Sequence, residues 1–105
     1  MPVLKIENRE FLVDDQGFLR TPEIWDAEVA RLFAVSQGIE ALDENHWKVI
    51  NLIRKYYEEH GIAPMIRYLC KSTGLLLRDI YELFPEGPAQ GACKIAGLPK
   101  PEGCV

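Results

Sequence analysis

The distribution of glycine and proline divides this chain into a part that suits regular secondary structure and a part that does not. Of its 8 glycines and 7 prolines, eight residues lie in the last 21 positions of the 105-residue chain. Both residue types are disfavoured inside helices, glycine by its conformational entropy and proline by its missing backbone donor. Pro99 and Pro101 also push the residues before them toward extended geometry. We therefore expect a folded body that ends at Gly97 and a stiff arm over residues 98–105.

The body is predicted to be mainly helical with a β-hairpin at its front. Val3–Glu7 and Glu10–Val13 are typical of two short strands around a turn at Asn8–Arg9, and a second turn follows before Phe18. Apolar residues then recur at helical spacing between capping residues, glycines and prolines. The expected helices cover residues 22–37 (with Asp26 as an alternative start), 43–60, 64–71, 75–84 and, as a short final helix, 89–96.

These elements fit one small domain. With 48% hydrophobic and 27% charged residues, the composition is that of an ordinary globular protein. The predicted fold class is mainly α (α+β): a β-hairpin over residues 1–20, a small helical bundle over 21–97 and an extended, flexible C-terminal arm over 98–105. The expected helices 64–71 and 75–84 form a pair that resembles a helix-turn-helix.

A helix-turn-helix raises the alternative of a DNA-binding regulator. Arg67, Lys71 and Arg78 lie on the two helices of the pair. The formal net charge of the chain is -4, however, whereas proteins that bind duplex DNA usually carry a basic excess. We therefore do not expect DNA as a partner, and DNA reading is kept as the weaker alternative.

The cysteines indicate the cellular compartment of the protein and limit the chemistry that it can perform. Three cysteines without a secretory signal argue against an extracellular disulfide framework, and no apolar run is long enough to cross a membrane. We expect a cytoplasmic protein without membrane insertion. Zinc sites usually contain close cysteine pairs, which Cys70, Cys93 and Cys104 do not form with each other, so no metal ligand is assigned. Cys70 lies in an apolar helical stripe and is interpreted as a packing residue.

Cys93 and Cys104 are placed differently from Cys70. Cys104 is the penultimate residue of the arm, and Cys93 lies eleven positions upstream on the short helix before Gly97. Such a pair suits a carrier thiol on the arm and a resolving thiol on the body. Lys94 and Lys100 are close enough in sequence to stabilise a thiolate. A static disulfide that clamps the tail is the alternative, which a reducing cytosol disfavours.

The tail also carries a resemblance to a known family. The run from Leu83 to Val105, with Cys93 and Cys104 in it, resembles the C-terminus of the DsrC/TusE family of small sulfur-relay proteins. The turn at Asp15–Leu19 and the His46-Trp47 pair are similar as well, so the resemblance covers essentially the whole chain.

The resemblance implies a protein co-substrate and not an autonomous enzyme. In such proteins the arm enters dissimilatory sulfite reductase, whose sirohaem belongs to the partner, and this chain itself is expected to bind no cofactor. Cys104 would accept sulfur there, and Cys93 would join it in an intramolecular trisulfide or disulfide that a membrane-bound thiol or trisulfide redox complex turns over.

A second branch of the family sets the main alternative. Relatives devoted to tRNA 2-thiouridine synthesis typically keep only the penultimate cysteine, so the presence of Cys93 together with Cys104 favours the sulfite reductase branch. A tRNA sulfur relay, with other sulfurtransferases as partners, remains the alternative. The direction of the sulfur pathway does not follow from the sequence.

Overall fold

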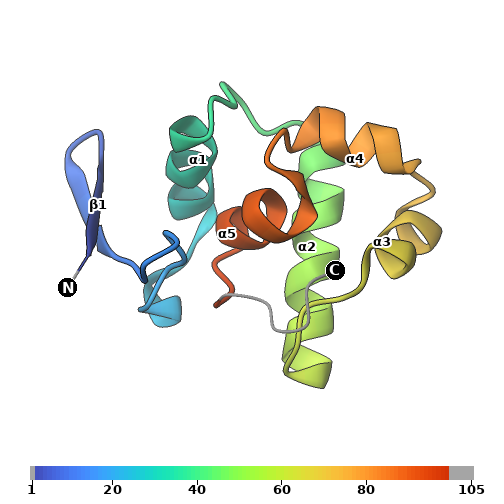
Figure 1. Cartoon of the computed structure of the whole chain (residues 1–105), viewed down its shortest axis with the longest axis horizontal. Coiled ribbons are helices and arrows are strands. Elements are labelled where there is room, and N and C mark those ends of the chain that lie inside the picture. The colour runs from blue at the N-terminus through green and yellow to red at the C-terminus, as the bar shows by residue number, and fades with distance from the viewer. Residues whose placement is uncertain (1, 100–105) are drawn as a thin grey trace.

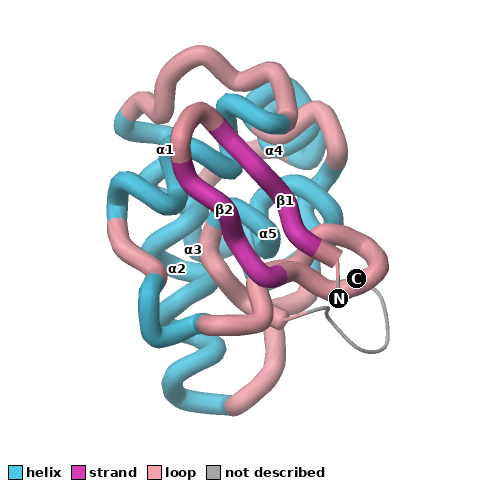
Figure 2. The backbone as a smooth tube through the Cα atoms, turned by 90° about the vertical axis from the view of Figure 1, so that its left-hand side faces the viewer, coloured by secondary structure: helices cyan, strands magenta, loops and turns pink. Residues whose placement is uncertain are grey.

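The N-terminal hairpin packs against the first α-helix. The computed structural model describes residues 2–99. Strands β1 (Val3–Ile6) and β2 (Arg9–Leu12) pair in antiparallel register, with Val3 opposite Leu12 (Figure 2). The predicted turn at Asn8–Arg9 is wrong by one residue, because Glu7 adopts a left-handed conformation with φ 56 and Arg9 pairs with Ile6.

The first predicted helix is divided in two. A 3₁₀ turn, η1 (Pro22–Ile24), precedes helix α1 (Ala27–Ser36), which begins at the alternative start. Asp26 caps α1 by accepting a hydrogen bond from the Val29 amide at 2.9 Å. Trp25, which the helical spacing had placed on the helix, lies between η1 and α1 instead, and this frees its indole for contacts described below.

The remaining helices follow the prediction with shifted ends. Helix α2 (Glu44–His60) begins after Asp43 and stops at Gly61, as expected. Helices α3 (Ile66–Thr73) and α4 (Leu77–Leu83) each begin two residues later than predicted. The last helix is not uniform: a π-helical turn, η2 (Pro88–Ala92), leads into the short α5 (Cys93–Ile95).

The core is built around α5. This helix contacts both α1 and α2 and lies in front of α2 in Figure 1, while the hairpin packs on α1. Phe33 of α1 meets Phe11 of β2 edge to face, with ring centroids 5.2 Å apart. Leu98, which we had placed at the start of the arm, is buried and belongs to the packed body. The rest of the predicted arm, from residue 100 on, lies outside the described residues.

His46 connects the beginning of α2 to the end of α4. The residue lies in the first turn of α2, yet its side chain is only 7% exposed. Its Nε2 lies 2.8 Å from the carbonyl oxygen of Leu83, and its ring packs edge to face on Phe84. Since that carbonyl only accepts, Nε2 carries a proton and donates. The His46 backbone amide donates to the Asp43 carboxylate at 3.0 Å, and the ring Nδ1 lies 2.9 Å from the same oxygen; these contacts lower the pKa of Asp43.

Neither a membrane span nor a metal cluster is found among residues 2–99. No helix in this range is long and apolar enough to cross a bilayer. No group of three His, Cys, Asp or Glu side chains within it could hold a metal ion.

Replacement of His46 tests its structural role. We expect His46→Ala to lower the free energy of unfolding by about 2–3 kcal/mol, because it leaves the Leu83 carbonyl without its donor and removes the ring from Phe84. Urea denaturation measures the loss. The matched control is His60→Ala on the exposed end of α2, where only a ring contact with Tyr56 is lost. Equal effects of the two substitutions would contradict the proposed link.

Candidate functional site around Cys93

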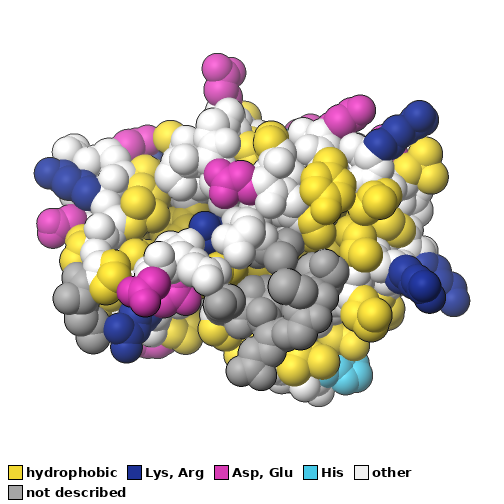
Figure 3. Space-filling model, viewed as in Figure 1, with side chains coloured by type: hydrophobic (Ala, Val, Ile, Leu, Met, Phe, Trp, Pro, Cys, Tyr) yellow, Lys and Arg dark blue, Asp and Glu magenta, His cyan; other side chains and the backbone are white. Residues whose placement is uncertain are grey.

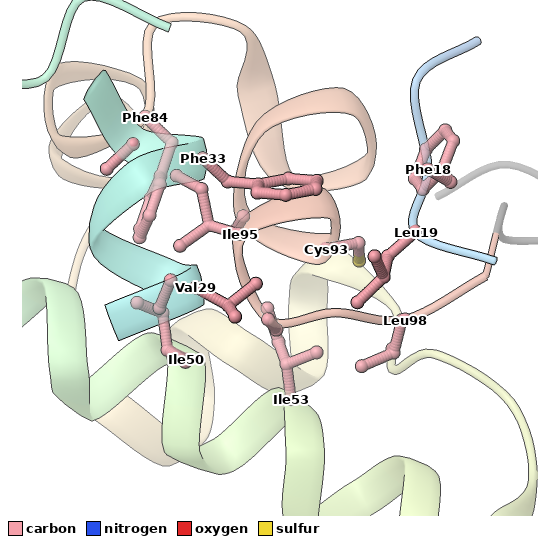
Figure 4. Packing of buried hydrophobic residues seen from close by; sticks show 14 of the residues in the cluster. Phe18, Leu19, Val29, Phe33, Ile50, Ile53, Phe84, Cys93, Ile95 and Leu98 are labelled. Atoms are coloured by element: carbon pink, nitrogen blue, oxygen red, sulfur yellow. The ribbon is translucent and has the colours of Figure 1, made fainter. Parts of the chain in front are cut away.

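Cys93 lies in the hydrophobic core at the first residue of α5. Its side chain is 2% exposed, and Figure 4 shows it pointing toward Leu19 among the buried residues of the cluster. Burial raises the pKa of the Cys93 thiol to about 12. The thiol is therefore protonated at neutral pH and unreactive while the core is closed, because the thiolate is the nucleophile.

Lys94 does not stabilise a Cys93 thiolate, contrary to our expectation. Its ammonium nitrogen lies 5.2 Å from the centre of the Phe18 ring, in a cation–π contact beside Gly17. Burial is the cause of the raised Cys93 pKa, and no charge within residues 2–99 opposes it. Lys100, the other lysine considered, lies outside the described residues.

The chain leaves α5 through a Schellman motif. The Leu98 amide donates to the Cys93 carbonyl at 3.1 Å, and the Gly97 amide donates to the Lys94 carbonyl at 3.0 Å. This is the 6→1 and 5→2 pair that ends many helices, with the left-handed residue Gly97 at φ 77 and a buried hydrophobic residue after it. Leu98 is thus tied directly to the backbone of the residue that carries the thiol.

Two side chains from other elements complete this helix end. The indole Nε1 of Trp25 donates to the Ile95 carbonyl at 2.9 Å, and the Arg54 guanidinium of α2 donates to the Ala96 carbonyl at 2.6 Å. Arg54 also stacks on Trp25, 3.7 Å from the ring centroid. Every carbonyl from Cys93 to Ala96 consequently has a donor, although the helix itself supplies none. We call Trp25, Arg54, Gly97 and Leu98 the α5 cap.

Gly97 is required for space as well as for its backbone conformation. A Cβ atom at this position would lie 2.3 Å from Cδ1 of Trp25. The positive φ also disfavours any residue with a side chain. The glycine therefore lets the backbone pass directly against the indole.

The π-helical turn before Cys93 is attached to the rest of the protein by glutamine side chains. The Gln37 amide nitrogen at the end of α1 lies 3.3 Å from the Gly91 carbonyl oxygen and 3.5 Å from that of Gln90. Gln90 in turn donates to the Gln16 side chain at 3.4 Å. Within residues 2–99, the buried Gln37 Oε1 has no hydrogen-bond partner. These long contacts hold η2 less firmly than the cap holds the other end of α5.

A pocket opens beside the cap, at the point where the described chain ends. It has a volume of about 560 Å³, and Leu19, Leu98, Pro99, Arg54 and Tyr57 are among the residues that line it. Cys93 is not in the lining, whereas its neighbours Leu19 and Leu98 are. A reagent in this pocket therefore meets leucine side chains before it meets the thiol.

The two other cysteines are not brought to this site by the described structure. Cys104 lies outside the described residues. Cys70 is on α3, half-buried rather than fully buried as a packing role suggested, and it lines a separate groove. The structure thus places one of the two predicted site residues, Cys93.

Comparisons with known proteins identify the family. The family model described as "DsrC like protein" matches residues 5–105. The chain belongs to the DsrC family. It is 46% identical to the gamma subunit of dissimilatory-type sulfite reductase from Nitratidesulfovibrio vulgaris, over 100% of both chains. It is 40% identical to the sulfurtransferase TusE from Pectobacterium atrosepticum, over 98% of this chain and 100% of the relative.

Solved structures of DsrC proteins share the fold. A chain in the crystal structure of dissimilatory sulfite reductase I superposes with a TM-score of 0.87 at 48% identity, covering 99% of this chain and 100% of the other. The oxidized gamma subunit DsrC from Archaeoglobus fulgidus gives a TM-score of 0.83 at 43% identity, with the same coverage. The predicted helical fold with an N-terminal hairpin is thereby confirmed.

The α5 cap yields a paired prediction. We expect Gly97→Ala to cost about 2–4 kcal/mol of unfolding free energy, from the left-handed backbone and the overlap with Trp25 together. Gly61→Ala is the matched control, because Gly61 has φ 74 but nothing within 4 Å of its added Cβ. The control should lose only about 1–2 kcal/mol. If thermal or urea unfolding gave the same loss for both variants, the close approach of Trp25 would not matter.

Proposed function

We propose that this chain carries sulfur as a protein substrate of dissimilatory sulfite reductase, with Cys104 as the acceptor and Cys93 as the second thiol. The similarity to a gamma subunit of that enzyme over the full length supports the partner. The single structural observation that carries the proposal is the position of Cys93. It lies buried where the C-terminal segment begins, and its backbone carbonyl accepts a hydrogen bond from the Leu98 amide of that segment.

In the proposed reaction, the reductase and the two thiols together supply the electrons that reduce the sulfur of sulfite. One hydrogen sulfite ion, two thiols, two electrons and three protons give one trisulfide and three water molecules. The sulfur atom falls from oxidation state +4 to 0; the reductase supplies two electrons, and the two thiols supply two more. A membrane-bound thiol redox complex would then deliver four electrons and four protons, which regenerates both thiols and releases hydrogen sulfide.

Burial of Cys93 determines the order of these reaction steps. A protonated thiol behind Leu19 and Leu98 does not attack the sulfur on Cys104 until Leu98 moves. Movement of Leu98 breaks its hydrogen bond to the Cys93 carbonyl and exposes the thiol at the same time. The loaded arm would thus wait for an opening at its own base, which protects the sulfur intermediate from premature exchange.

Mass spectrometry tests the two-cysteine mechanism. After turnover with sulfite reductase, sulfite and an electron donor, we expect wild-type chain with one sulfur atom bridging Cys93 and Cys104. Cys104→Ala should take up no sulfur, and Cys93→Ala should form no bridge. Cys70→Ala is the control and should behave as wild type. Wild-type rates of sulfide release by Cys93→Ala would remove the resolving role.

The TusE relatives favour a second candidate, a sulfur relay for tRNA modification. This function needs Cys104 alone, so a stable persulfide on Cys104, unaffected by Cys93→Ala, would support it. DNA binding is the weakest candidate. The chain has a formal net charge of -4, whereas proteins that bind duplex DNA usually carry a basic excess.

A further inference from the structure

The surface formed by α3 and α4 is unusually apolar for an exposed face. Of the large hydrophobic side chains that are exposed among residues 2–99, six of ten lie between residues 62 and 81: Ile62, Met65, Tyr68, Leu76, Leu77 and Tyr81. Figure 3 shows hydrophobic side chains gathered over α3 and α4, with Lys or Arg side chains at the edge. A contiguous patch of this kind marks an interaction site more often than a solvated surface does.

A groove between α3 and α4 borders this patch and shares Leu76 and Leu77 with it. It has a volume of about 590 Å³ and is lined by apolar side chains together with two cations; the lining includes Ile66, Arg67, Cys70, Lys71, Leu76 and Leu77. Neither Arg67 nor Lys71 makes an ion pair or a side-chain hydrogen bond with another residue between 2 and 99. The groove therefore offers apolar contact and two unpaired positive charges at once. We call it the α3–α4 groove.

We propose that the α3–α4 groove docks an apolar segment with acidic side chains on the protein that exchanges sulfur with this chain. The inference rests on the proposed function for the identity of that protein. Leucine-type side chains of the segment would fill the space beside Leu76 and Leu77, and its carboxylates would pair with Arg67 and Lys71. Apolar anchors surrounded by complementary charge are the usual composition of a specific interface.

Other occupants fit the charges less well. In a symmetric dimer centred on this groove, Arg67 and Lys71 lie close to the two-fold axis, so these cations of the two copies would approach one another. An anionic membrane surface is recognised by clusters of four to eight bases. Helices α3 and α4 carry three bases and two acids, Asp79 and Glu82, a formal sum of +1.

The groove lies apart from the α5 cap. Its lining shares no residue with the pocket where the described chain ends, which contains Arg54, Leu98 and Pro99. In Figure 1, α3 and α4 lie on the right of α2, and α5 lies in front of it. A partner segment in the groove therefore leaves the pocket beside the cap open for the sulfur exchange. The groove would supply affinity and the segment the chemistry.

Cys70 provides a direct reporter of occupancy, because it lines the groove. In a full-length Cys93→Ala/Cys104→Ala chain, Cys70 is the remaining thiol, and its alkylation rate by iodoacetamide is measured with and without a synthetic helical peptide. The peptide carries leucines along one face and glutamates beside them. We expect it to slow alkylation about tenfold at saturation. A peptide with lysines in place of the glutamates, or an Arg67→Glu/Lys71→Glu chain, should give no protection. Equal protection by both peptides, or by neither, overturns the proposal.

A second measurement uses purified catalytic subunits of sulfite reductase as the probe. Leu76→Ser/Leu77→Ser should raise the KM for sulfur loading of Cys104 about tenfold with kcat unchanged, because both side chains are exposed in the free chain. The matched control is Val3→Ser/Leu12→Ser on the hairpin, with comparable exposure of 52% and 42%. An unchanged KM overturns the docking site even if loading occurs.

Three further outcomes separate the alternatives. If wild-type chain is not loaded at all, the proposed function fails, and the peptide measurement still decides whether the groove takes an acidic segment. If wild-type chain dimerises in sedimentation experiments and Leu76→Ser/Leu77→Ser does not, the groove binds a second copy and the proposal is overturned. Binding to phosphatidylserine vesicles that the same substitutions abolish would overturn it in favour of a membrane.

Discussion

The end of α5 is held by hydrogen bonds that the helix itself cannot make, and the arrangement of the site depends on them. Trp25 comes from the segment before α1, Arg54 from α2, and the Gly97 and Leu98 amides from the chain that leaves α5. A buried carbonyl without a donor costs about 1–3 kcal/mol. Loss of one donor therefore disturbs the position of α5, and with it Cys93.

The same cap determines the reactivity of Cys93. Because Leu98 is both a cap residue and part of the wall between the pocket and the thiol, the hydrogen bonds that hold Leu98 also keep the thiol buried, and burial raises its pKa. Local opening of a few residues is common in native proteins and costs less than global unfolding. In this account the α5 cap sets how often Cys93 becomes available, while the α3–α4 groove lets a partner remain bound in the meantime.

The sequence predicts the helices well and the long-range contacts poorly. The ends of α2 follow from Asp43 and Gly61, which are local signals. The burial of His46 has no local signal, because the Leu83 carbonyl that its ring contacts is 37 positions away. Trp25 and Arg54 gave no signal either, since their partners on α5 are 70 and 42 positions distant.

The end of the packed body near Leu98 likewise depends on contacts that local sequence signals do not show. Gly97 correctly marked the end of the last described helix, but Leu98 is fixed in the core by a hydrogen bond to Cys93 that follows from the Schellman geometry of Gly97. The π-helical form of η2 also depends on packing, with Gly91 held against Phe84 and Gln37. Cys93 and Cys104 were selected by their spacing and by the family resemblance, whereas the burial of Cys93 emerged only from the fold.

The alkylation rate of Cys93 tests most directly whether the α5 cap closes off this thiol. In a Cys70→Ala/Cys104→Ala chain, we predict that iodoacetamide modifies native Cys93 at least about 100-fold more slowly than the urea-unfolded chain. Leu98→Ala and Arg54→Met should accelerate the native reaction, whereas Arg31→Met, which removes exposed ion pairs with Glu7 and Glu28, should not. A native rate equal to that of the unfolded chain, or one that the cap substitutions leave unchanged, would contradict the account.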